Sequence, residues 1–142
     1  ESLTKGTQKE ILTDIQTHSW VTSDANQDYI PFGPSPTESD STADTLNDDT
    51  LFIPPYKGIL ESFTLYSAVG VSSAPGATRV LLRVNGTNGA YVQETVANET
   101  ATKFSFTSGN TFNANDRVRI SIDPANTTKN STATSIWKYV VA

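Results

Sequence analysis

The densest group of side chains able to hold a ligand is an acidic segment in the first third of the chain. Its carboxylates are separated mainly by Ser, Thr and Asn, and lie at Glu38, Asp40, Asp44, Asp48 and Asp49. Hard oxygen donors of this kind suit Ca²⁺, although the glycine-containing EF-hand pattern is missing. The simpler interpretation is a solvated acidic loop. We therefore expect no cofactor, and calcium at Asp40, Asp44, Asp48 and Asp49 is the alternative hypothesis.

Few residues of this chain could perform catalysis. His18 is the single histidine and there is no cysteine, which excludes multi-histidine and thiolate metal sites and cysteine nucleophiles. A Ser-His-Asp triad could use only His18, and no G-x-S-x-G elbow occurs. Glu61 and Glu94 could face each other as a glycosidase pair, but most mid-strand glutamates of a sandwich face water. We expect no enzymatic activity and a structural or surface role for His18.

Aromatic side chains offer a binding hypothesis of a different kind. Tyrosine and phenylalanine rings can stack on sugars, and the candidates here are Tyr29, Phe32, Tyr56, Tyr66 and Tyr91. The simpler use of these rings is to close the core or subunit contacts. A carbohydrate-binding module is therefore an alternative to a structural protein.

Length and composition predict one domain rich in β-structure. The 142 residues suffice for a proper core. Thr, Ser and Asn dominate the polar residues, and these favour strands and turns. A net charge of −5 without basic clusters argues against nucleic acid or an anionic membrane as partner. No apolar run reaches the roughly 18 residues of a transmembrane helix, so we expect no membrane insertion. Because Met is absent, we expect a processed or cut product.

Short strands recur along the chain from residue 17 onward, about ten residues apart, and no segment shows convincing helical periodicity. The expected strands cover residues 17–21, 28–32, 51–54, 58–69, 78–86, 90–98, 102–108, 117–123 and 135–141. Pro31 makes the second of them an edge strand. The almost wholly polar segments 33–50 and 124–134 are expected to be loops. This pattern predicts an all-β, antiparallel β-sandwich of jelly-roll-like form.

Residues 1–16 fit either one helical face or one face of a strand, and their Thr residues favour an extended N-terminal arm or linker. The domain proper then covers residues 17–142. Ile11, Leu12 and Ile15 are the residues of the arm expected to pack on a neighbouring subunit. Further partner contacts are expected from four loop residues, Glu38, Asp40, Asn126 and Lys129.

The segment FNANDRVRISIDP, residues 112–124, predicts a tight polar corner at 113–116 followed by a central strand. Val118, Ile120 and Ile122 alternate with polar residues and should point into the core. Arg117 and Arg119 should then face solvent or a neighbouring subunit. In the strand at 58–69, Ile59, Phe63 and Leu65 should likewise share one face.

Five motifs in a fixed order carry a family resemblance. They are His18 with Trp20, Tyr29 to Gly33, Pro55 to Gly58, Phe112 to Pro124, and Ile136 to Tyr139. Over residues 17–141 the chain resembles small β-sandwich proteins and tail-fibre terminal domains of tailed bacteriophages, particularly marine ones. The family usually carries Gly before the Asp of the corner, where this chain has Asn115. Because Asn tolerates left-handed backbone, the turn can survive.

The resemblance implies a virion structural component on the exterior of the particle, usually trimeric, without catalysis or cofactor. The favoured interpretation is a tail-fibre terminal domain that binds a glycan or receptor on the host surface. The alternative is a capsid decoration protein that uses residues 1–16 as its anchoring arm. The implied partners are copies of this chain and other virion proteins.

Overall fold

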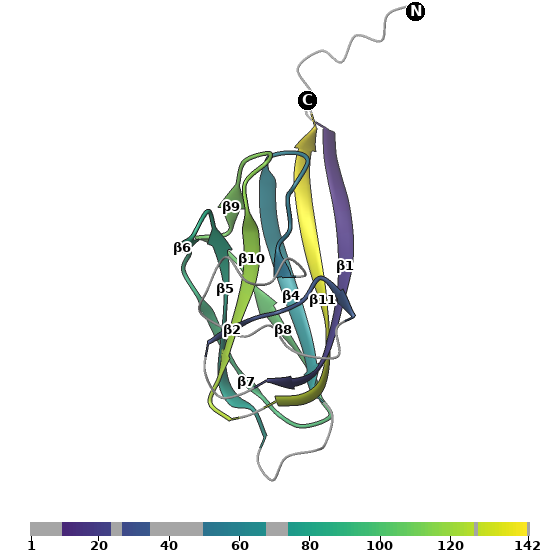
Figure 1. Ribbon diagram of the computed structural model, residues 1–142, viewed down its shortest axis with the longest axis vertical. Coiled ribbons are helices and arrows are strands. Elements are labelled where there is room, and N and C mark those ends of the chain that lie inside the picture. The colour runs from purple at the N-terminus through teal and green to yellow at the C-terminus, as the bar shows by residue number, and fades with distance from the viewer. Residues whose placement is uncertain (1–9, 24–26, 35–49, 68–73, 127, 142) are drawn as a thin grey trace, which may run out of the picture.

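The computed structural model describes residues 10–23, 27–34, 50–67, 74–126 and 128–141. Within these ranges the chain forms eleven strands and no helix longer than a single turn, and the strands build two packed sheets (Figure 1). All pairs of strands are antiparallel except the short pair of β1 with β3. The predicted all-β antiparallel sandwich is therefore confirmed.

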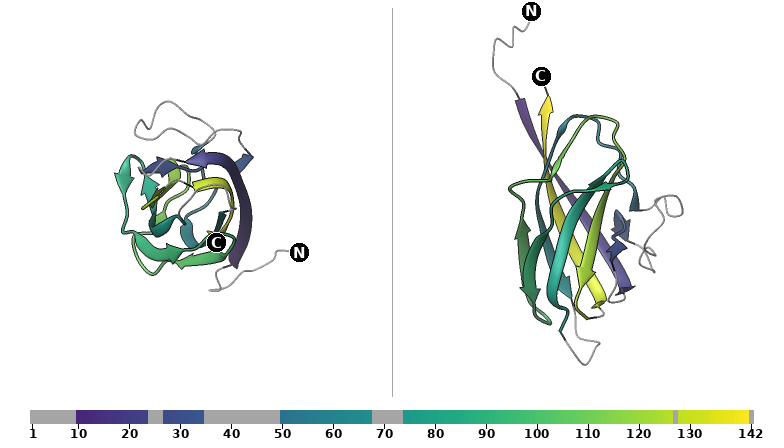
Figure 2. Two further views of the ribbon diagram at one scale, coloured as in Figure 1. Left: turned by 90° about the horizontal axis from the view of Figure 1, so that it is seen from below. Right: turned by 90° about the vertical axis from the view of Figure 1, so that its left-hand side faces the viewer.

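Each sheet takes strands from both halves of the chain, as Figure 2 shows from two further sides. Sheet A has the order β3 (Gly33–Pro34), β1 (Glu10–Ser23), β11 (Thr128–Val141), β4 (Gly58–Ser67) and β8 (Ala101–Ser105), and β9 (Thr111–Phe112) also pairs with β4. Sheet B has the order β2 (Asp28–Tyr29), β10 (Val118–Pro124), β5 (Gly76–Val84) and β6 (Thr87–Asn88), and β7 (Val92–Val96) also pairs with β5.

The core lies between the sheets and follows the predicted alternation in several strands. Val118, Ile120 and Ile122 of β10 are fully buried, as expected. Opposite them sheet A contributes Trp137 and Phe63, both without exposed surface. Burial of about 25 cal/mol per Å² of apolar surface makes this layer the main stabilising contribution of the fold.

The strand β4 departs from its predicted alternation. Phe63 and Leu65 are buried, but Leu60 takes the inward position expected for Ile59. The pairing register explains the change: Ser62 lies opposite Ile136 and Leu60 opposite Trp137, so Glu61 is an extra residue on β4. A bulge of this kind reverses the inward and outward faces of the residues that precede it.

Two expected boundaries were also wrong. The short strand expected from Leu51 to the Pro54-Pro55 break is only an isolated bridge between Phe52 and Val118, because the prolines lack the N–H groups that would extend a ladder. The expected loop at 124–134 ends early, since β11 begins at Thr128 and pairs there with the end of β1. Of the expected loop at 33–50, residues 35–49 lie outside the described residues.

Arg119 is a further correction. It was expected to face solvent or a neighbouring subunit, yet it is only 4% exposed. The reason is the position of β10, which lies inside sheet B between β2 and β5. By contrast, the edge position expected for residues 28–32 is confirmed by β2, the outermost strand of sheet B in the described part of the chain.

The segment expected to be an arm is extended where the structure describes it. Residues 10–16 form the first half of β1, which crosses the expected boundary between residues 16 and 17 without a break. The pairing of β1 with β11 begins at Glu10 opposite Val141 and ends at Ser23 opposite Thr128. The start of β1 and the end of β11 therefore lie side by side at one end of the molecule (Figure 1).

The polar corner before β10 is held by side-chain hydrogen bonds. Asp116 accepts hydrogen bonds from the Asn113 backbone N–H at 2.8 Å and from the Asn85 amide at 3.0 Å, and these bonds lower the pKa of its carboxyl group. Asn115 adopts the left-handed conformation, with φ of 67°. Asn85 and Gly86, with φ of 50° and 83°, form the turn between β5 and β6.

Replacement of Asn115 tests the conformation of this corner. Asn115→Gly should keep or slightly raise the free energy of unfolding, because glycine adopts positive φ without a steric penalty. Asn115→Val should lower it by about 1–3 kcal/mol, since a β-branched residue is strained there. Urea unfolding of the wild type and the two variants measures the order of their free energies of unfolding. A valine variant as stable as the wild type would contradict the assigned geometry.

Candidate functional site

His18 is the centre of a buried hydrogen-bond chain that joins β1 to β11. Its Nδ1 lies 2.6 Å from the carbonyl oxygen of Pro31, which can only accept, so Nδ1 carries the proton. Its Nε2, 2.7 Å from the Ser135 hydroxyl, then accepts a hydrogen bond from that group. The Ser135 oxygen in turn accepts one from the Trp137 indole N–H at 2.8 Å. Each polar atom of this chain therefore has a partner when His18 is neutral.

The surroundings of His18 strongly favour the neutral ring. The side chain is 1% exposed, and the Phe32 ring lies edge-on to it at 4.9 Å between centroids. Burial lowers the pKa of His18 from 6.5 to about 4, although the hydrogen bond to Pro31 acts in the opposite direction. A protonated ring would direct a second N–H at Ser135. We therefore assign His18 a structural role.

The two glutamates considered as a catalytic pair lie on strands of different sheets. Glu61 is the bulge residue of β4 in sheet A, and Glu94 lies in β7 of sheet B. Both side chains are exposed, and the Glu61 carboxylate is 3.8 Å from the Lys138 ammonium group. An exposed ion pair of this kind contributes at most about 1 kcal/mol. Two exposed carboxylates on separate sheets do not form the facing pair that glycoside hydrolysis requires.

The aromatic residues considered for sugar stacking are not gathered in one place. Tyr29 is buried, and Phe32 stacks on Phe52 with ring centroids 5.3 Å apart. The Arg79 guanidinium lies 4.5 Å from the centre of the Tyr91 ring, so one face of that ring is already covered. The exposed members of the group are divided among three segments: Tyr56 before β4, Tyr66 in β4 and Tyr91 before β7. They provide no common platform for a sugar ring.

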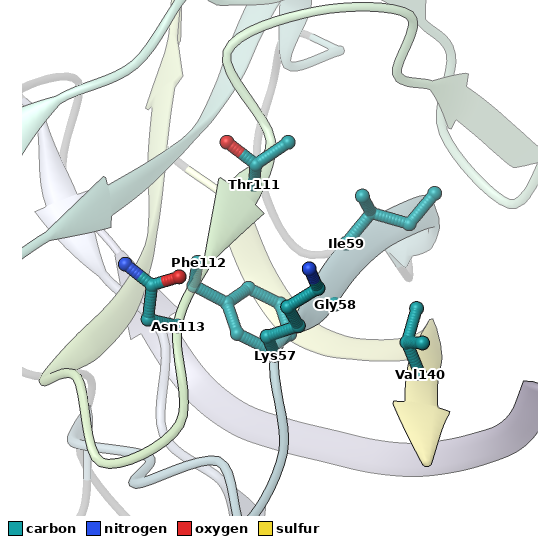
Figure 3. A pocket seen from close by; sticks show the side chains of 7 residues that line it. All are labelled: Lys57, Gly58, Ile59, Thr111, Phe112, Asn113 and Val140. Carbon is teal, nitrogen blue, oxygen red and sulfur yellow. The ribbon is translucent and has the colours of Figure 1, made fainter. Parts of the chain in front are cut away.

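An open pocket of about 310 Å³ lies beside the start of β4 (Figure 3). The Phe112 ring points toward the backbone around Gly58, where a Cβ atom would approach the Lys138 carbonyl oxygen to 2.0 Å. The remaining lining residues are Lys57, Ile59, Thr111, Asn113 and Val140. Its polar side chains are exposed. The pocket therefore lacks a buried polar group that would select a ligand.

The first half of β1 exposes the three residues that the sequence singled out. Ile11, Leu12 and Ile15 are 56%, 46% and 62% exposed. One edge of β1 pairs with β11, whereas β3 reaches the other edge only at His18 and Ser19. In the described part of the chain, residues 10–17 thus form an open edge, which we call the open β1 segment.

The outward face beside this segment is largely aliphatic, and it carries Lys138 with Glu61 beside it. Ile11 lies opposite Val140, and Ile15 lies opposite Ile136 on β11. Between these two cross-strand pairs, the Lys138 ammonium group donates a hydrogen bond to the Thr13 hydroxyl at 2.6 Å. The open β1 segment therefore continues an aliphatic surface of β11, and the lysine is held within it.

The other predicted contact residues are not brought to the open β1 segment. Asn126 is exposed in the connection between β10 and β11, at the opposite end of the molecule (Figure 1), and its amide donates to the Ala74 carbonyl at 2.9 Å. Lys129 lies in β11, where its backbone pairs with Thr22. The acidic candidates lie outside the described residues: Glu38, Asp40, Asp44, Asp48 and Asp49.

Two findings concern the described residues as a whole. Among them, no three His, Asp or Glu side chains gather in a group that could hold a metal ion. The same part of the chain contains no helix long and apolar enough to cross a membrane.

Sequence reasoning missed the contacts that connect β1 to β11. Asp14 accepts a hydrogen bond from the Tyr139 hydroxyl at 2.9 Å, and burial together with this bond raises the pKa of Tyr139. Ser135 was not expected to have any role, although it joins His18 to Trp137. These partners are more than 110 residues apart in sequence, and no local pattern indicates their register.

No family model and no curated protein sequence matches this chain. Solved structures with a similar arrangement include a Bacillus endospore appendage that forms disulfide-linked pili, with 18% identity, a TM-score of 0.48 and coverage of 100% of this chain and 98% of the other. The globular domain of zebrafish complement 1qA has 14% identity, a TM-score of 0.45 and coverage of 90% and 97%. The acidic stable capsid of Helicobacter pylori bacteriophage KHP30 has 11% identity, a TM-score of 0.40 and coverage of 94% of each chain. Likeness at this level carries no argument about function.

The depressed pKa of His18 predicts a pH dependence of stability. The unfolded chain takes up the proton at about 6.5 and the folded chain at about 4, so the stabilisation is complete above 6.5 and is lost as the pH falls to 4. The loss from this group should be about 3 kcal/mol. Urea unfolding of the wild type and of His18→Gln, repeated between pH 7 and pH 4, measures this loss. The difference between their free energies of unfolding should become smaller as the pH falls.

The single histidine also permits a direct check by NMR titration. The ring protons of His18 should shift with a midpoint near pH 4. A midpoint near 6.5, or unfolding curves of the two proteins that keep a constant separation, would contradict the assigned hydrogen-bond chain.

Proposed function

We propose that this protein is a non-enzymatic structural component on the exterior of a bacteriophage particle, in which the open β1 segment contacts a neighbouring chain. The observation that carries the proposal is the exposure of Ile11, Leu12 and Ile15 on a strand edge that β11 holds from one side only. Exposed aliphatic residues on an open edge are typical of a surface that pairs with another chain.

The positions of the family motifs support a structural role. Residues of these motifs form the buried hydrogen-bond chain of His18, Pro31 and Trp137. The corner at Asn115 also belongs to these motifs and leads into the central strand β10. A scaffold built from these residues fits a protein that acts through its surface, and both ring nitrogens of His18 are occupied by hydrogen bonds.

The finer role that we propose is that of a tail-fibre terminal domain. The open β1 segment and the end of β11 lie at one end of the molecule, whereas the connection between β10 and β11 lies at the other (Figure 1). Contact with a neighbouring chain at the first end leaves the second end available to a host-surface glycan or receptor. The trimer that the family resemblance implies belongs to this proposal, and a calcium ion does not.

Detection in purified virus particles tests the proposal. Mass spectrometry of particles from the phage that encodes this chain should find it in stoichiometric amounts. Antibody labelling in electron micrographs should then place it at the tail tip, and fluorescently labelled protein should bind host cells. Absence of the chain from particles would reject the proposed function.

The same micrographs distinguish the fibre from capsid decoration. Label on the head, together with particles that burst more easily when the protein is lacking, would replace the fibre role by the decoration role. Binding of labelled protein to a purified polysaccharide, without any presence in particles, would instead favour a carbohydrate-binding module.

A further inference from the structure

The outward-facing side chains of the open β1 segment are arranged symmetrically about Thr13. Ile11 and Ile15 lie two residues before and two residues after it, on the same outward face of the strand. Exposed edge strands are usually protected by Lys, Pro or a bulge, and residues 10–17 contain neither Lys nor Pro. The charged residues of this edge are Glu10 and Asp14, so charge limits the register in which a second strand can pair with it.

We propose that two copies of this chain pair antiparallel through the open β1 segment, about a two-fold axis at Thr13. In this register Ile11 of one copy lies opposite Ile15 of the other, and the two Thr13 residues lie opposite each other. The same aliphatic pair forms twice, which is the self-complementarity that a two-fold contact requires. Cross-strand pairs of β-branched residues stabilise such a ladder.

Neighbouring registers are less favourable because of charge. Centring the axis on Asp14 sets two Asp14 carboxylates opposite each other, and centring it on Leu12 sets Glu10 opposite Asp14. Like charges in directly opposite positions destabilise a sheet. With Thr13 at the centre, Glu10 lies opposite Gln16 and Leu12 opposite Asp14, so no two residues of like charge are directly opposite in the paired strands.

The extent of the open edge limits the register from the other side. Centring the axis on Ile15 brings Leu12 opposite His18, whose edge is already paired with Gly33 of β3. Centring it on Thr13 uses residues 10–16, all of which precede the paired stretch. The ladder about Thr13 therefore ends before β3 begins, and it joins the two copies of sheet A into one continuous sheet.

The pairing predicts assemblies with an even number of chains. A two-fold contact forms dimers of single chains, or joins two trimers if the implied trimer forms through another surface. Only the location of the paired chains in a virus particle rests on the proposed function; the pairing itself does not. A chain that is absent from particles would reject that function and would leave the pairing to be decided by the experiments below.

Disulfide cross-linking tests the register, because the chain has no cysteine of its own. Residues directly opposite in an antiparallel pair have Cα atoms roughly 4.5–5.5 Å apart, within the range of a disulfide. Thr13→Cys should therefore cross-link to a dimer under mild oxidation. Two Cys residues at position 15 would be offset by about 13 Å along the strands, so Ile15→Cys should remain uncross-linked.

A mixture of Ile11→Cys and Ile15→Cys proteins provides the matched positive control. These two positions lie opposite each other in the proposed register, so the mixture should cross-link although neither protein does so alone. Faster cross-linking of Ile15→Cys alone than of Thr13→Cys would overturn the register. Equal thermal melting of the reduced variants shows that each is folded.

Light scattering at micromolar concentration tests the pairing without cysteines. The wild-type mass should be an even multiple of the 15.3 kDa chain, and Ile15→Lys should halve it by placing charge at the apolar contact. Ile53→Lys is the matched control, because Ile53 is also exposed and precedes β4. A wild-type mass of one or three chains, or an unchanged mass for Ile15→Lys, would overturn the proposal.

Discussion

A buried chain of hydrogen bonds from Trp137 through Ser135 and His18 to the Pro31 carbonyl fixes how the first and last strands meet. It contains one imidazole in one tautomer, and each donor in it has one acceptor. An unpaired polar atom at this depth costs about 1–3 kcal/mol of stability. These hydrogen bonds therefore specify a single pairing of β1 with β11. The segment after β2 is attached to the same histidine.

This constraint determines which surface remains open. β11 has β1 on one side and β4 on the other along most of its length, so β1 must lie outside it. β3 then covers the outer edge of β1 only beside the histidine, at residues 18–19. The first half of β1 therefore keeps its place in the sheet but exposes one edge and the side chains of Ile11 and Ile15. The surface that we assign to assembly is thus a consequence of the core.

The sequence predicted features that depend on neighbouring residues. The inward positions of Val118, Ile120 and Ile122 in β10 and the polar corner at residues 113–116 follow from local patterns and were correct. The bulge at Glu61 was not predicted, because it is defined by the register between β4 and β11. The burial of Arg119 likewise depends on which strands flank β10.

The candidate site was predicted in part for the same reason. Apolar residues at positions 11, 12 and 15 indicated a contact surface, but whether they lay on a helix or a strand depended on β11. Their exposure and the open edge beside them became visible only with the strand order.

Hydrogen–deuterium exchange of the backbone amides in β1, measured over a range of protein concentrations, tests most directly whether this edge is an assembly surface. Every second amide of residues 10–16 should become more protected as the concentration rises, because its N–H enters the ladder with the second copy. Amides of β10, which lies inside sheet B, should not change with concentration. Exchange of these alternate amides that stays fast at every concentration would contradict the account.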